Sequence, residues 1–167
     1  MRNTLVVRTA RALRAVGLAT LRFDFRGVEG SAGVHDGTQE VEDASAALGF
    51  LARAHPELPL WGAGYSFGSR IVAELALREG VIERLILIAF PVAVHSPRFL
   101  SEVTQPALLV LGGADPFGTA GELRKALPVL PAGLELAEIP GADHFFRGRT
   151  PLVEELVREY ARSALRR

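Results

Sequence analysis

Two short runs of the sequence are apolar at every position, residues 85–89 (L-I-L-I-A) and 107–111 (A-L-L-V-L). A strand with one face in water alternates apolar and polar residues, so a strand that is apolar throughout must be covered on both faces. Such strands are typical of parallel sheets, in which helices cross each face between one strand and the next. The two runs therefore predict an α/β protein built around a buried parallel sheet.

The remainder of the chain alternates between extended and helical patterns. Strand patterns also cover residues 18–23, 58–61 and 134–139, and apolar residues at helical spacing cover 3–16, 40–54, 67–77, 123–127 and 151–165. We expect a mostly parallel sheet of about five strands with helices on both faces. The 167 residues contain no linker, repeat or low-complexity segment, so we expect one domain over residues 1–167.

The segment Gly64-Tyr65-Ser66-Phe67-Gly68 lies between a predicted strand and a predicted helix. A G-x-S-x-G pattern at such a turn is typical of a nucleophile elbow, in which a strained turn projects the serine hydroxyl. We expect both glycines to be required, because a Cβ at either position would collide with the neighbouring strand or helix. The helix that begins at Phe67 directs its positive dipole end at an anion forming near Ser66.

Three reactive side chains follow three different strand patterns. Ser66 follows the elbow strand, Asp115 follows the strand at 107–111, and His144 follows the strand at 134–139. Because the carboxyl ends of parallel strands meet at one edge of a sheet, we expect these side chains to meet there. In the roles we expect, Ser66 attacks a carbonyl carbon, His144 takes its proton, and Asp115 holds the imidazole.

Each of these residues also has a plain structural interpretation. Ser66 fits a small residue in a tight turn, Asp115 before Pro116 fits a turn or a helix cap, and His144 fits a packed structural histidine. Asp143 is an alternative acid, although adjacent side chains rarely meet well enough for one to orient the other. Three residues at three strand ends, in the order Ser, Asp, His, favour the catalytic interpretation with Asp115 as the acid.

Composition and motif spacing argue against several other functions. The 19 basic and 19 acidic residues balance, which argues against a nucleic-acid or anionic-membrane surface. The chain has no cysteine, and its four scattered histidines form no ligand-spaced pair, so we expect no metal. The glycines near Ser66 loosely match a dinucleotide-binding pattern, but the next strand ends without the carboxylate that would bind a ribose. We expect no cofactor, no membrane partner and a cytoplasmic location.

Four segments together resemble the α/β-hydrolase superfamily, and within it the small hydrolases without a cap. They are residues 23–27 (F-D-F-R-G), 64–68, 112–115 (G-G-A-D) and 141–146 (G-A-D-H-F-F), spread over nearly the whole chain. The resemblance implies hydrolysis of esters or related acyl bonds, without a cofactor, on a small-molecule substrate. One departure is that relatives continue R-G-x-G-x-S, whereas residues 26–31 read R-G-V-E-G-S. A homodimer is an assembly that the sequence leaves open.

The second departure concerns the oxyanion hole. In this family one backbone N–H comes from a loop before the first helix, and the other comes from the residue after the nucleophile, here Phe67. Met1 stands at what resembles the point just after that loop. Relatives place an early strand between residues 18–23 and the elbow strand. Either the strand at 18–23 closes up against the elbow strand, or another segment fills that place, or the chain is an N-terminally truncated form, which is the alternative we favour. Losing one oxyanion donor typically lowers kcat by about 10²- to 10³-fold.

The substrate class is suggested by a short insert. Only residues 90–105 separate two predicted strands, which is too little for a cap domain. An open site suits short acyl esters, with Tyr65, Phe117 and Phe145 as substrate-binding walls. The alternative function is a degenerate, non-catalytic hydrolase fold that binds a ligand or partner.

Three further polar residues are kept as candidates near the site. His35 and Asp36, in the glycine-rich loop at 24–38, are candidates for substrate contact. His95 either borders the pocket or faces water.

Overall fold

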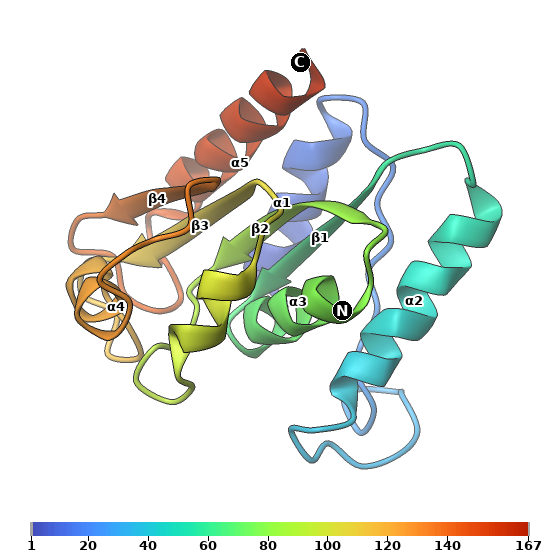
Figure 1. Cartoon of the computed structure of the whole chain (residues 1–167), viewed down its shortest axis with the longest axis horizontal. Coiled ribbons are helices and arrows are strands. Elements are labelled where there is room, and N and C mark those ends of the chain that lie inside the picture. The colour runs from blue at the N-terminus through green and yellow to red at the C-terminus, as the bar shows by residue number, and fades with distance from the viewer. Residues whose placement is uncertain (1, 167) are drawn as a thin grey trace.

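Four parallel strands form a single sheet in the computed structural model, which describes residues 2–166. The strands lie side by side in chain order: β1 (Leu60–Tyr65), β2 (Ile82–Ile88), β3 (Ala107–Gly112) and β4 (Leu134–Ile139). Each neighbouring pair is parallel, so all four carboxyl ends lie at one edge of the sheet (Figure 1). The expected α/β class with a parallel sheet is confirmed.

Helices cover both faces of the sheet. α1 (Thr4–Arg14) and α5 (Thr150–Leu165), from opposite ends of the chain, pack together on one face (Figure 1). The other face carries α2 (Glu40–Ala54), α3 (Phe67–Arg78), the 3₁₀ helix η1 (Pro97–Glu102) and α4 (Ala120–Ala126). In residues 89–106, all of which the structure describes, η1 is the sole helix, so no cap domain is inserted between β2 and β3.

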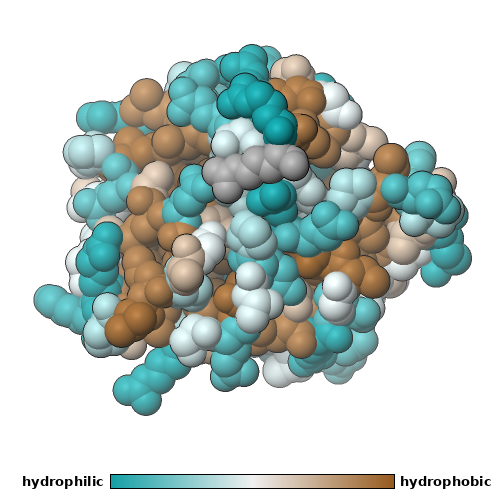
Figure 2. Space-filling model, turned by 45° about the horizontal axis from the view of Figure 1, so that its top comes forward, coloured by the Kyte–Doolittle hydropathy of each residue, from teal (hydrophilic) through white to brown (hydrophobic). Residues whose placement is uncertain are grey.

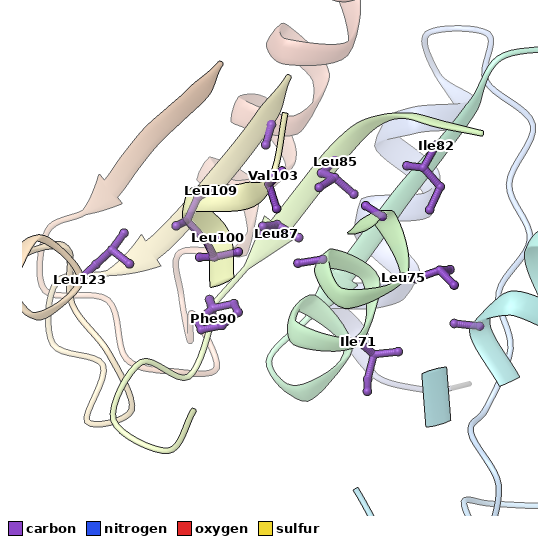
Figure 3. Packing of buried hydrophobic residues seen from close by; sticks show 14 of the residues in the cluster. Ile71, Leu75, Ile82, Leu85, Leu87, Phe90, Leu100, Val103, Leu109 and Leu123 are labelled. Carbon is purple, nitrogen blue, oxygen red and sulfur yellow. The ribbon is translucent and has the colours of Figure 1, made fainter. Parts of the chain in front are cut away.

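The side chains of the two central strands alternate between the two faces, as the pleat of a strand requires. Leu85, Leu87 and Leu109 belong to the layer with α3 and η1 (Figure 3). Ile86 and Val110 belong to the layer with α1 and α5. All five side chains are at most 1% exposed, which explains why both runs are apolar at every position.

The predicted strand at residues 18–23 is wrong, and the described residues form four strands rather than about five. Leu18 packs against the layer of α1 and α5, and Phe23 packs against the opposite layer. β1 pairs with β2 alone within residues 2–166, so its other edge has no partner strand there. A strand forms only where a neighbour accepts its backbone hydrogen bonds, and the side-chain pattern does not show whether a neighbour is within reach.

Capping side chains set several helix ends. The Asn3 side chain accepts from the amides of Leu5 (2.9 Å) and Val6 (3.3 Å), so α1 begins one residue later than predicted. The reciprocal bonds of Thr119 and Glu122 form a capping box, and α4 therefore begins three residues before the predicted helix at 123–127. A polar capping pattern thus extends the helix beyond its apolar residues.

A hollow of about 470 Å³ lies between residues 21–32 and α2. Its lining includes Leu21, Phe23 and Phe50, the last with 57% of its surface exposed. Figure 2 shows one face of the molecule, on which apolar residues are interrupted by polar ones. Neither Ser66 nor His144 lines this hollow, so it is separate from the candidate site described below.

Across residues 2–166, no helix combines the length and hydropathy needed to cross a bilayer.

Candidate active site

Ser66 lies at the turn between β1 and α3 in a backbone conformation that few residues adopt. Its φ and ψ angles are 53° and −120°, and positive φ is unfavourable for a residue with a Cβ. The Ser66 amide donates to the carbonyl of Ile88 in β2 (2.8 Å), and the Ser66 carbonyl accepts from the hydroxyl of Ser69 (2.6 Å). These bonds hold the backbone in the conformation that the elbow motif predicts.

The two glycines of the elbow have different structural roles. A Cβ on Gly64 would meet the backbone of Gly68 and Ser69, so only glycine fits where the end of β1 approaches the first turn of α3. A Cβ on Gly68 would have the Phe25 ring as its nearest neighbour, at 3.9 Å, which is an ordinary contact. The expectation that both glycines are needed for space is therefore correct at Gly64 and wrong at Gly68.

The structure brings Ser66, Asp115 and His144 together, as their strand ends predict. The His144 Nε2 atom lies 2.8 Å from the Ser66 Oγ atom, and the His144 Nδ1 atom lies 2.7 Å from the Asp115 Oδ2 atom. Asp115 is 3% exposed and His144 is 6% exposed. The three side chains form one hydrogen-bonded series in which the imidazole connects the carboxylate to the hydroxyl.

The loop after β4 must cross the sheet edge to make these contacts. β1 and β4 are the outer strands, and three strand spacings separate their ends by about 14 Å. The two segments approach closely at Gly112, where a Cβ would lie 2.5 Å from the carbonyl oxygen of Ala142. The amide of Ala114 also donates to that carbonyl (2.9 Å). The absence of a side chain at Gly112 thus allows the loop that carries His144 to lie against the end of β3.

Asp115 is held from two sides. Its Oδ1 atom accepts from the amide of Phe117 (2.8 Å), while its Oδ2 atom faces the imidazole of His144. The carboxylate therefore both closes a local turn and orients the histidine, so the two interpretations of Asp115 from the sequence are not exclusive. Asp143 instead accepts from the amide and the guanidinium of Arg147, each at 3.0 Å. The bond from the Arg147 amide is the main cause that lowers the pKa of Asp143.

Three aromatic rings surround His144. Those of Tyr65, Phe117 and Phe145 lie 5.5, 4.7 and 5.5 Å from the imidazole, measured between ring centroids. Phe117 is 41% exposed and Phe145 is 52% exposed, so both present apolar surface beside the histidine. The Tyr65 hydroxyl instead donates to the backbone carbonyl of His144 (3.1 Å). Burial raises the pKa of Tyr65 to about 12, and the nearby Asp115 charge adds to this rise, so the phenol keeps its proton.

Phe67 contributes its backbone and its ring to different parts of the site. Its amide belongs to the first residue of α3, and the first amides of a helix have no acceptor within the helix. In a nucleophile elbow, the amide at this position is available to an anion that forms at the serine. The Phe67 ring contacts the imidazole of His35. The centroid of the His95 imidazole lies 6.5 Å from the centroid of the Phe67 ring. Burial is the main cause that lowers the pKa of His95.

Two groups near the site were missed at the sequence level. The Tyr65 hydroxyl was predicted only as part of a substrate wall, and Glu40 only as the start of a helix. Glu40 is completely buried and lies 2.6 Å from the imidazole of His35. No sequence signal locates either contact, because the partners are brought together by packing. In the described part of the chain, no group of three or more His, Cys, Asp or Glu side chains is arranged to hold a metal ion.

Comparisons with known proteins find matches over nearly the whole chain. A family model described as an alpha/beta hydrolase domain matches residues 1–164. An uncharacterised protein of Rickettsia prowazekii is 32% identical over 173 aligned residues, which cover 96% of this chain and 71% of that protein.

Two solved structures are also similar. An alpha-beta serine hydrolase homologue from Coxiella burnetii is 35% identical with a TM-score of 0.88, over 96% of this chain and 77% of that one. A serine hydrolase without a lid from Xanthomonas campestris is 31% identical with a TM-score of 0.88, over 98% of this chain and 74% of that one.

The unequal roles of the elbow glycines give a paired test of stability. We expect Gly64→Ala to lower the free energy of unfolding by about 3 kcal/mol or more, because its Cβ meets backbone that has no room to move. Gly68→Ala, in the first turn of α3, should change that free energy by less than about 1 kcal/mol. Urea unfolding of both variants measures the difference, and equal losses would contradict the close approach at Gly64.

Proposed function

Because the chain belongs to the alpha/beta hydrolase domain family, we propose that it is a serine hydrolase that cleaves carboxylic esters of small acyl groups. The observation that carries this proposal is the series from Asp115 through His144 to Ser66, with contacts of 2.7 and 2.8 Å. A nucleophile within hydrogen-bond distance of a base, with a third group orienting that base, is the arrangement that covalent catalysis requires.

In the first half of the reaction, Ser66 Oγ attacks the ester carbonyl carbon while His144 Nε2 takes its proton. The carbonyl oxygen becomes an oxyanion, which the Phe67 amide and the positive end of α3 stabilise. Asp115 keeps the hydrogen of the imidazole on Nδ1 and stabilises the imidazolium that forms. The intermediate collapses, His144 protonates the departing alcohol oxygen, and the acyl group remains on Ser66.

In the second half, water takes the place of the alcohol. His144 takes a proton from this water as it attacks the acyl carbon, and a second tetrahedral intermediate forms. Its collapse releases the carboxylic acid and returns the proton from His144 to Ser66. The burial of Asp115 and His144 supports these steps, because a hydrogen-bonded ion pair is stronger away from water.

The preference for small acyl groups is supported by the lack of a cap between β2 and β3. The exposed rings of Phe117 and Phe145 are the apolar contacts we propose for the substrate, because both lie beside His144. For Tyr65 we propose contact through the ring alone, since its hydroxyl is engaged with the His144 carbonyl.

Covalent labelling tests the nucleophile. We expect a fluorophosphonate probe to label the folded protein at Ser66, and Ser66→Ala to abolish both labelling and p-nitrophenyl butyrate hydrolysis. Asp115→Asn should lower kcat by about 10⁴-fold, because it changes the imidazole tautomer. Ser163→Ala, near the end of α5, is the control and should match the wild type. An unlabelled wild-type protein would favour a non-catalytic hydrolase fold, and an active Ser66→Ala variant would exclude the mechanism.

A series of p-nitrophenyl esters tests the proposed substrate size. We expect kcat/KM to be highest for acetyl or butyryl esters and to fall for long-chain esters, because no cap supplies apolar surface along a long acyl chain. Equal or better hydrolysis of the palmitoyl ester, measured below its critical micelle concentration, would contradict this preference.

Removing the Tyr65 hydroxyl tests its part in positioning His144. We expect Tyr65→Phe to lower kcat for p-nitrophenyl butyrate by about fivefold with little change in KM, since one hydrogen bond is worth about 1 kcal/mol. Tyr160→Phe, which removes the hydroxyl of the other tyrosine, on α5, is the matched control. A rise in KM without a fall in kcat would instead indicate that the hydroxyl binds substrate.

A further inference from the structure

A second carboxylate–imidazole pair lies beside the candidate active site. The Nδ1 atom of His35 is 2.6 Å from the Oε1 atom of Glu40, close to the 2.7 Å between His144 and Asp115. The Glu40 side chain is completely buried, whereas that of His35 is 43% exposed. The mechanism above uses neither residue.

Glu40 is held as an anion at the start of α2. Its Oε1 atom accepts from the amides of Asp36 (2.9 Å) and Gly37 (3.1 Å), while Oε2 is buried without a hydrogen-bond partner among the described residues. Burial acts to raise the pKa of Glu40, but the backbone bonds and His35 outweigh it and hold that pKa below its usual value. A carboxylate accepts hydrogen bonds and donates none, so Nδ1 of His35 carries the hydrogen and Nε2 is left for another partner.

The position of His35 is fixed relative to the nucleophile. Its ring meets the ring of Phe67, the residue after Ser66, edge to face with the centroids 4.9 Å apart. The guanidinium of Arg70 in α3 donates to the carbonyl of Gly37 (3.0 Å) and lies 5.7 Å from the same Phe67 ring. Glu74 binds Arg70 through both carboxylate oxygens, at 2.8 and 3.2 Å. The loop with His35 is therefore tied to the helix that begins at the elbow.

A half-exposed imidazole with one nitrogen engaged suits a hydroxyl group. When His35 is neutral, Nε2 accepts a hydrogen bond, and when His35 is protonated, Nε2 donates one. A hydroxyl serves as partner in both states because it is both donor and acceptor. A carboxylate is a poorer partner, because Glu40 already places a buried negative charge 2.6 Å from this ring.

We propose that His35, oriented by Glu40, determines specificity by hydrogen bonding a hydroxyl group of the ester that Ser66 attacks. This inference rests on the proposed function. The hydroxyl belongs either to the acyl part or to the alcohol part of the ester, and the chemistry at Nε2 is the same in both cases. A substrate with such a hydroxyl gains an interaction that a plain alkyl ester lacks.

Three esters measured by pH-stat titration test the proposal. Ethyl butyrate is the reference, the enantiomers of ethyl 3-hydroxybutyrate add a hydroxyl to the acyl part, and glycerol 1-butyrate adds hydroxyls to the alcohol part. We expect the wild type to prefer at least one hydroxylated ester in kcat/KM. His35→Phe, which keeps a ring against Phe67, should reduce that preference by about fivefold, the effect of one lost hydrogen bond.

Two further variants separate hydrogen bonding from packing. His35→Gln retains a side-chain donor and should keep part of the preference, and Glu40→Gln should weaken it by loosening the imidazole. His55→Phe, at the exposed end of α2, is the matched histidine control and should leave the ratio unchanged. The preference is a ratio measured on one protein, so a general loss of folded enzyme cancels.

The outcomes distinguish the two proposals. In one outcome, Ser66 is labelled and ethyl butyrate is hydrolysed, but His35→Phe leaves the ratio of kcat/KM between hydroxylated and plain esters unchanged. That outcome would overturn the role of His35 alone. A wild type that prefers neither hydroxylated ester would overturn it as well. If the wild type hydrolyses none of the three esters and Ser66 remains unlabelled, the proposed function itself is wrong, and this inference with it.

Discussion

The spacing of the sheet is the constraint on which the candidate site depends. Ser66 and His144 follow the two outer strands, whose ends are about 14 Å apart, yet their side chains approach to 2.8 Å. The loop after β4 spans this distance by crossing the end of β3, where Gly112 has no Cβ to meet the carbonyl of Ala142. Asp115 follows β3 and therefore lies beside this crossing, where its carboxylate meets the imidazole. A side chain at Gly112 would displace the loop that carries His144, whose imidazole contacts both Ser66 and Asp115.

Hydrogen bonds stabilise the polar groups that this crossing buries. Both oxygens of Asp115 have partners, and the Tyr65 hydroxyl binds the His144 carbonyl. Each of these groups would cost about 1–3 kcal/mol if it were buried without a partner, so the network favours one arrangement of the loops. The pair of His35 and Glu40 differs, because one Glu40 oxygen has no partner in the described residues and the imidazole is open to solvent. The network around His144 therefore positions its members, whereas the imidazole of His35 can still bind a ligand.

Sequence reasoning succeeded where a pattern acts over a few residues and failed where a distant partner decides. The elbow backbone at Ser66 follows from its local motif, and the structure has the expected positive φ there. The strand at 18–23 was predicted from its side chains alone. Within residues 2–166, however, β1 is hydrogen-bonded to β2 only, and residues 18–23 do not join the sheet. Gly68 was assigned a steric role by symmetry with Gly64, although its neighbour Phe25 leaves room for a Cβ. The helical pattern of residues 40–54 did not indicate that the Glu40 side chain is buried.

By itself the sequence determined the parallel sheet, its two apolar layers and the three strand ends that carry Ser66, Asp115 and His144. These features follow from burial and from the backbone geometry of short segments, which the residue types at those positions control directly. The sequence favoured Asp115 over Asp143 as the partner of the imidazole, but only the tertiary structure established that contact and the contact of Glu40 with His35. These contacts depend on distances between segments far apart in the chain. Such distances are set by how the helices and loops pack on the sheet, and no single segment contains that information.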